Sequence, residues 1–110
     1  MDERRRRIGE NEALYRSINE RIEDINETFG MVSGTMAVVC ECGSIECTEQ
    51  IELDIATFER VRADSAQFVV IPGHEIPDVE TVVERHETFY VLRKDPGGPA
   101  ELAAELDERS

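Results

Sequence analysis

The segment TMAVVCECGSIECTEQIEL, residues 35–53, decides the fold because it combines two strand-like runs with all three cysteines of the chain. Residues 35–42 are β-branched and apolar, whereas residues 49–53 alternate polar and apolar side chains, and both patterns are typical of strands. Gly43 permits a tight turn between the two runs. The segment therefore predicts a hairpin that carries the three cysteines at one end: Cys40, Cys42 and Cys47.

Three thiols within eight positions cannot pair off among themselves, and such a cluster favours a metal site. Cys40 and Cys42 lie two positions apart, so that on a strand they point to the same face, and Cys47 returns from the following loop. A fourth ligand is needed for tetrahedral zinc. His74 is the better candidate because it follows a Pro-Gly pair that fixes and then reverses the chain, whereas His86 lies in an expected hairpin turn. We predict one structural zinc on Cys40, Cys42, Cys47 and His74.

Two other interpretations of the cluster remain open at this point. The cysteines could be ordinary buried thiols with His74 as a hydrogen-bonded loop histidine. Alternatively, two of them could oxidise to a disulfide while the third acts as the resolving thiol. Nearby carboxylates raise the pKa of a thiol, which argues against a highly reactive thiolate without a metal; they belong to Glu41, Glu46 and Glu49.

Residues 4–28 show the spacing of an amphipathic helix, with apolar or aromatic side chains at intervals of three and four. The stripe consists of Ile8, Tyr15, Ile18, Ile22, Ile25 and Phe29, with Asn11 in the gap. One interpretation is a helix that lies on its own sheet. The other is a homodimer through residues 8–29, in which Asn11 would set the register of the paired helices.

The remaining pattern predicts a helix at 55–63 with Asp54 as N-cap, a strand at 67–71, and a second hairpin at 79–94 that turns at 85–87. The predicted fold class is α+β: an N-terminal amphipathic helix plus a small, mainly antiparallel sheet with a short second helix, stapled by one zinc. We expect three regions, namely the helix at 1–30, a core at 31–94 and a flexible acidic tail at 95–110.

The 110 residues include 25 acidic and 12 basic ones, giving a net charge of −13, which predicts repulsion from nucleic acids and acidic membranes. The chain has no long apolar run, so no membrane partner is expected. The odd number of cysteines and the lack of an export signal favour the cytoplasm. Nucleotide-binding and hydrolase motifs are missing from the sequence, which makes an enzyme the less favoured class.

Several short motifs in combination resemble a set of small uncharacterised proteins of high-GC Gram-positive bacteria. The resemblance spans residues 8 to 94, and no activity is known for that set. It implies that the cysteines and the Pro-Gly-His loop are parts of one design. The motifs are NEALYRSINERIEDIN (11–26), CEC with Cys47, FERVRAD (58–64), PGHE (72–75) and VVERHETFYVLRK (82–94).

These observations together predict a small cytosolic, zinc-stabilised regulatory or adaptor protein that acts through protein–protein contacts. Its acidic surface suits a partner with a basic surface. The first alternative is a thiol and zinc redox sensor. The second is a small metalloenzyme, which would need an open coordination position on the metal.

Overall fold

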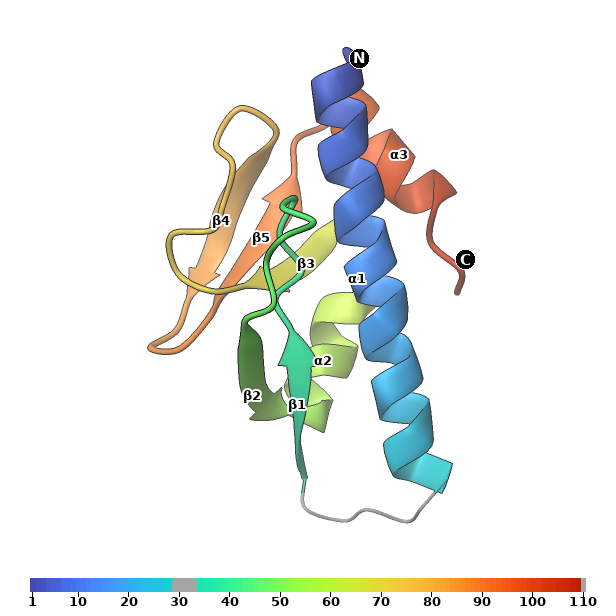
Figure 1. Ribbon diagram of the computed structural model, residues 1–110, viewed down its shortest axis with the longest axis vertical. Coiled ribbons are helices and arrows are strands. Elements are labelled where there is room, and N and C mark those ends of the chain that lie inside the picture. Colours follow the sequence, from blue (N-terminus) through green and yellow to red (C-terminus); the bar gives the residue numbers. More distant parts are fainter. Residues whose placement is uncertain (29–33, 110) are drawn as a thin grey trace.

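The structure is a computed structural model that describes residues 1–28 and 34–109. It confirms the α+β class, with a long N-terminal helix that runs beside two small sheets (Figure 1). The elements follow the predicted order, and one further helix is present near the C-terminus. They are α1 (Glu3–Thr28), β1 (Thr35–Val39), β2 (Gln50–Asp54), α2 (Ile55–Arg62), β3 (Gln67–Val70), β4 (Glu80–Arg85), β5 (Tyr90–Lys94) and α3 (Gly98–Glu105).

The strands form two antiparallel sheets, where the sequence pattern predicted one mainly antiparallel sheet. β1 pairs with β2, and the second sheet has the order β3-β5-β4 with a register shift between Val82 and Glu84. The sheets separate because the chain leaves β1 at Val39 and enters the cysteine loop. Hydrogen bonds connect this loop to the second sheet, among them one in which the Glu41 N–H donates to the carbonyl of Val69 at 2.8 Å.

The apolar core lies between these sheets and α2. Alternate residues of β1 and β2 point inward, and the expected inward residues of α2, Phe58 and Val61, are each 1% exposed. Burying each such aliphatic or aromatic side chain stabilises the folded protein by about 1.5 to 3 kcal/mol, before the entropy cost of ordering the side chain is subtracted. Asp54 occupies the N-cap position of α2, although its side chain makes no capping hydrogen bond. No helix among the described residues is long and apolar enough to cross a membrane.

Helix α1 packs through only part of the predicted apolar stripe. Ile8 and Tyr15 are buried and Ile22 packs against the core, but Ile18 and Ile25 are exposed. Phe29, the last member of the predicted stripe, lies outside the described residues. The buried face is instead largely polar and includes Glu12, Arg16, Asn19, Glu20 and Glu23. The stripe was a poor guide because polar partners for these side chains come from distant segments that local periodicity does not reveal.

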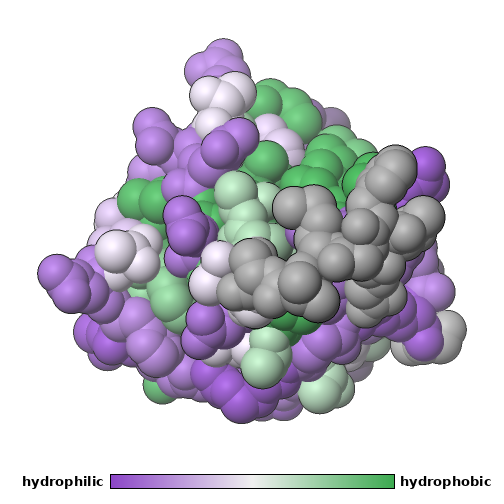
Figure 2. Space-filling model, turned by 90° about the horizontal axis from the view of Figure 1, so that it is seen from below, coloured by the Kyte–Doolittle hydropathy of each residue, from purple (hydrophilic) through white to green (hydrophobic). Residues whose placement is uncertain are grey.

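Helix α1 carries exposed apolar side chains, namely Leu14, Ile18 and Ile25. At the end of the molecule that carries the C-terminus of α1, hydrophobic and hydrophilic residues both reach the surface (Figure 2). Isolated exposed apolar residues are normal in folded proteins. Homodimerisation through residues 8–29 therefore stays a prediction, and the solution mass of the protein tests it.

Buried ion pairs attach α1 to the rest of the fold. Lys94 Nζ lies 2.6 Å from a carboxylate oxygen of Glu12 and 3.0 Å from one of Glu80, and all three side chains are at most 1% exposed. The guanidinium of Arg16 stacks over the ring of Phe68 and donates to the carbonyl oxygens of Ser65 and Ala103. Because buried charges need such partners, these contacts fix the position of α1 on β5, β3 and α3.

The C-terminal region differs from the predicted flexible tail. Residues 98–105 form α3, which packs against α1 and β5 with Leu102 and Ala103 buried. Beyond the helix, Asp107 bonds to buried Arg62 at 2.9 Å, and Arg109 bonds to Glu23 at 2.8 Å. The acidic composition of 95–110 suggested disorder, but the tail carries the apolar and charged partners that the polar face of α1 requires.

Glu23 gives a pH-dependent prediction for stability. Burial, together with a hydrogen bond to Glu59, raises its pKa from 4.5 to about 7, although Arg109 opposes the rise. At a pH between these two pKa values, Glu23 holds a proton in the folded protein that it releases in the unfolded chain. Glu23 therefore makes the stability of the fold decrease as the pH rises from 5 to 8. We expect the stability of E23Q relative to the unmodified protein to increase across that range by about 1 to 2 kcal/mol.

Urea unfolding at pH 5, 6, 7 and 8, in buffers of the same zinc concentration, measures this difference. Comparing the two proteins at each pH cancels any pH dependence that both share. A difference that stays constant or shrinks as the pH rises would contradict the shifted pKa of Glu23.

Candidate metal centre

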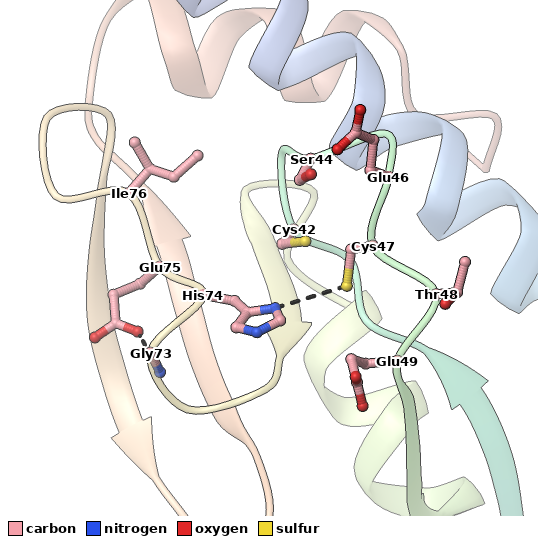
Figure 3. Close-up of a pocket in the computed structure, with 10 residues that line it drawn as sticks. All are labelled: Cys42, Ser44, Glu46, Cys47, Thr48, Glu49, Gly73, His74, Glu75 and Ile76. Atoms are coloured by element: carbon pink, nitrogen blue, oxygen red, sulfur yellow. Dashed lines mark hydrogen bonds between the residues drawn. The ribbon is translucent and has the colours of Figure 1, made fainter.

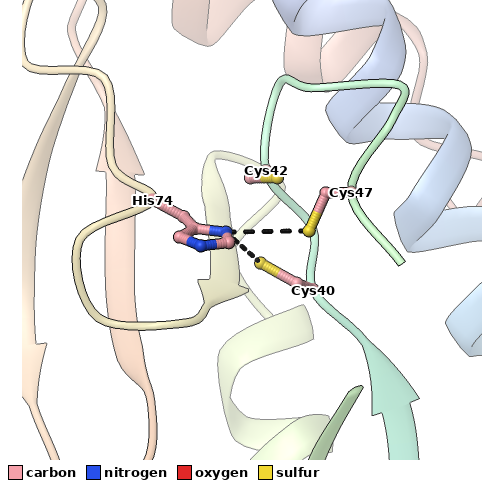
Figure 4. Close-up of side chains that lie close together, drawn as sticks. All are labelled: Cys40, Cys42, Cys47 and His74. Atoms are coloured by element: carbon pink, nitrogen blue, oxygen red, sulfur yellow. Dashed lines mark hydrogen bonds between the residues drawn. The ribbon is translucent and has the colours of Figure 1, made fainter. Parts of the chain in front are cut away.

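The four predicted ligands come from three separate segments that meet where the two sheets join. Cys40 and Cys42 follow β1, Cys47 lies in the loop before β2, and His74 lies between β3 and β4 (Figure 4). One ligand atom from each residue can be chosen so that all four lie within 4.8 Å of one another. The structure therefore brings together all four residues, close enough to hold one metal ion. His86 lies elsewhere, exposed in the β4–β5 turn and stacked on Phe89, as predicted.

Two of the distances between ligand atoms match those of a tetrahedral site. His74 Nδ1 lies 3.5 Å from the sulfur of Cys40 and 3.6 Å from the sulfur of Cys47. A tetrahedral ion with zinc–sulfur bonds of about 2.3 Å and a zinc–nitrogen bond of about 2.05 Å places sulfur and nitrogen about 3.6 Å apart. The contacts between the imidazole and these two thiols thus have the lengths of tetrahedron edges.

Backbone groups of the loop after β3 position His74 and contact the sulfur of Cys40. The loop 71–74 closes when the His74 N–H donates to the Ile71 carbonyl at 3.0 Å, and Gly73 adopts a φ of 95°, which favours glycine. The Ile71 N–H donates to the sulfur of Cys40 at 3.2 Å. The same short loop therefore presents the imidazole of His74 and donates a hydrogen bond to the sulfur of Cys40. Such hydrogen bonds are expected of groups around metal ligands.

Side chains of α1 hold the cysteine loop from the opposite side. Asn11 Nδ2 donates to the Gly43 carbonyl at 2.9 Å, and the hydroxyl of Tyr15 lies 2.8 Å from the carbonyl oxygen of Ile45 and 3.2 Å from that of Cys47. Gly43 lies so close to the helix that an added Cβ would come within 2.5 Å of the side chain of Ile8. Asn11 thus contacts the cysteine loop, and its role in setting a dimer register stays a prediction.

A buried carboxylate lies between the two buried cysteines. Glu41 accepts hydrogen bonds from Asn19 Nδ2 at 2.8 Å and from the Val69 N–H at 3.0 Å. Burial raises its pKa to about 7, and these hydrogen bonds oppose the rise.

Sequence reasoning missed the roles of Asn19 and Glu41. The available signal was the recurrence of Asn11, Tyr15 and Asn19 at every fourth position, which places them on one face of a helix.

The thiols have different acidities without a metal. A hydrogen bond from Cys40 lowers the pKa of Cys42 to about 5, and a backbone hydrogen bond from Ser44 adds to the effect. The same contact with Cys42, followed by burial, raises the pKa of Cys40, and burial also raises that of Cys47. The cluster by itself therefore favours one thiolate with protons on its neighbours. A divalent cation would replace those protons and stabilise all three thiolates.

A cavity of about 540 Å³ opens beside the cluster. Cys42, Cys47 and His74 line it, together with other residues of the cysteine loop and of the loop after β3 (Figure 3). Cys40 does not line this cavity and is 1% exposed, whereas Cys47 and His74 are half-buried. One side of the metal centre therefore meets solvent. The other lining residues are Ser44, Glu46, Thr48, Glu49, Gly73, Glu75 and Ile76.

No protein-family model matches the chain, and no characterised protein or solved structure shows significant similarity to it.

Proposed function

We propose that Cys40, Cys42, Cys47 and His74 bind one structural zinc ion and that the chain is a small zinc-stabilised regulatory or adaptor protein, acting through contacts with other proteins. The observation that carries the proposal is the convergence of three sulfurs and one imidazole nitrogen within 4.8 Å. Thiolate and imidazole together select zinc among the metals that are generally available in cells.

Four protein ligands favour a structural role over catalysis. A catalytic zinc ion keeps one position for water or substrate, whereas a closed tetrahedral site has none. The ligands also link segments that are distant in the sequence, because Cys40 and Cys42 extend from β1 and His74 follows β3. A metal at this junction would fasten the two sheets to each other, and its binding energy would be folding energy.

Replacing His74 tests whether the four residues bind zinc and whether the zinc stabilises the fold. We expect H74A to lose most of its zinc affinity and to unfold at a lower urea concentration, while H86A, which removes the exposed histidine, leaves both unchanged. Native mass spectrometry gives the metal stoichiometry, and circular dichroism follows unfolding. A metalloenzyme with an open position predicts instead that H74A folds normally.

Cobalt substitution tests the closed site independently. Co²⁺ bound to three sulfurs and one nitrogen has a visible spectrum that reports its coordination. We expect no spectral change when azide is added, because no position is open to it. A spectral change that saturates with azide would favour the metalloenzyme alternative.

The redox sensor is supported by one observation, which is that Cys47 faces the cavity and is the most accessible of the three sulfurs. In that reaction two cysteine thiols and one hydrogen peroxide give one disulfide and two water molecules, and the metal is released. Measuring bound zinc after peroxide and again after a dithiol reductant tests it. Unchanged zinc content and unchanged solution mass would remove this alternative.

A further inference from the structure

The cavity at the metal centre has the size of a binding site. Its volume of about 540 Å³ falls in the range of about 300 to 1,000 Å³ that is usual for such sites. One wall is the loop 42–49 and the other is the loop 73–76 (Figure 3). Because these two loops supply the metal ligands Cys42, Cys47 and His74, an ion that draws the ligands together also fixes the distance between the walls.

The charge of the cavity is negative. Three thiolates and a neutral imidazole around a divalent ion leave a net charge of −1. The carboxylates of Glu46, Glu49 and Glu75 add to this, and no lysine or arginine is among the residues that line the cavity. A concave site of one charge sign attracts ligands of the opposite sign. Charge complementarity therefore indicates a cationic occupant.

The arrangement of the carboxylates indicates an extended cation and not a second metal ion. Figure 3 shows Glu46, Glu49 and Glu75 on different sides of the pair formed by Cys47 and His74, with their carboxylates apart. The carboxylate of Glu75 is held by the Gly73 N–H at 2.9 Å. Within residues 1–28 and 34–109, the cysteine and histidine cluster is the one group whose ligand atoms converge on a point.

An exposed apolar side chain beside the cavity distinguishes a protein segment from a small polyamine. Ile45 is 58% exposed in the same loop, between the lining residues Ser44 and Glu46. Its carbonyl accepts from the hydroxyl of Tyr15, which anchors the backbone while the side chain faces solvent. A peptide can contact both an apolar side chain and a negative cavity, whereas a polyamine carries only charge and short methylene links.

We propose that this cavity binds a basic segment of a partner protein, with arginine or lysine side chains near the separate carboxylates of Glu46, Glu49 and Glu75 and an apolar neighbour on Ile45. This inference rests on the proposed function, because it assigns the chemistry of the partner to the same metal centre. It identifies the cysteine loop as the contact surface, in place of α1.

The test measures binding of zinc-loaded, full-length protein to the fluorescein-labelled, end-blocked peptides Gly-Arg-Leu-Gly-Arg-Gly and Gly-Lys-Leu-Gly-Lys-Gly by fluorescence anisotropy. We expect binding that weakens with added salt. E46Q/E49Q is expected to weaken it at least tenfold. E10Q/E87Q removes the same two charges from exposed sites away from the cavity and should change it less than twofold. I45S should weaken binding of the peptides but leave binding of spermine unchanged.

Equal losses in the two double variants would show attraction by overall charge and overturn the assignment. Failure of both peptides to bind, or spermine binding as tightly as the peptides, would also overturn it. Native mass spectrometry of every variant separates this inference from the proposed function. One zinc per chain together with failed peptide binding would overturn the inference alone, and loss of zinc in E46Q/E49Q would contradict the placement of these residues at the cavity rim.

Discussion

Replacing Cys40 with serine, C40S, is expected to abolish tight zinc binding and to leave a chain without a cooperative unfolding transition at 25 °C. Cys40 is 1% exposed, and its sulfur contacts both His74 Nδ1 and the Ile71 N–H. Zinc contributes an apparent 10 to 16 kcal/mol to the folding of small zinc-finger peptides, roughly the whole stability of an ordinary domain of about 5 to 15 kcal/mol. Loss of the ion should therefore be the largest single effect available in this chain.

A chelator provides the matched comparison for C40S. If the variant acts through the metal, then removing zinc from the unmodified protein should produce the same loss, and the two changes together should cost no more than either alone. Isothermal denaturation with and without chelator measures this, with T48S in the exposed part of the same loop as control. C40S that unfolds cooperatively at the unmodified urea midpoint would contradict a metal-dependent fold.

The second large effect is expected at Lys94. K94M removes the one cation between two buried carboxylates, Glu12 and Glu80, which lie 2.6 Å and 3.0 Å from its amine. Breaking a buried pair by removing one partner costs about 3 to 5 kcal/mol, because the remaining charge stays buried without compensation. We expect K94M to lose this amount in urea unfolding at pH 7.

The loss of stability should depend on whether the charge of Lys94 or that of Glu12 is removed. Burial, followed by hydrogen bonding to Glu80, raises the pKa of Glu12 well above its usual value, so that removing the charge of Glu12 should cost less stability than removing that of Lys94. E12Q keeps an oxygen that can accept from Lys94 and should cost less than about 1.5 kcal/mol, the usual scale of one hydrogen bond. Equal losses in K94M and E12Q, or no loss in K94M, would contradict this account of the buried charges.

The elements of the fold could be predicted because each depends on local patterns. β1 is a run of β-branched and apolar residues, β2 alternates polar and apolar residues, and α2 shows Phe58 and Val61 on one face. The cluster of three cysteines and His74 could be predicted from ligand chemistry, since sulfur and imidazole in a chain with only two histidines leave few combinations. The Pro-Gly pair before His74 identified which histidine lies in a fixed loop.

The packing of α1 and of the C-terminal region could not be predicted in this way. Lys94 and Glu12 are 82 positions apart, and Arg16 and Ala103 are 87 apart, so neither contact leaves a local pattern. Ile18 and Ile25 follow a helical stripe yet face solvent, while charged residues on another face are buried. Periodicity reports which side chains are apolar, but it does not report which polar side chains find partners in the folded state.

Zinc K-edge X-ray absorption of the purified protein tests the central claim most directly, because it measures the ligand atoms around the metal. We expect one zinc per chain, coordinated by three sulfurs at about 2.3 Å and one nitrogen at about 2.0 to 2.1 Å. H74A should lose the nitrogen contribution, and H86A should leave the spectrum unchanged. A first shell made mainly of oxygen, or a folded protein that contains no metal, would contradict it.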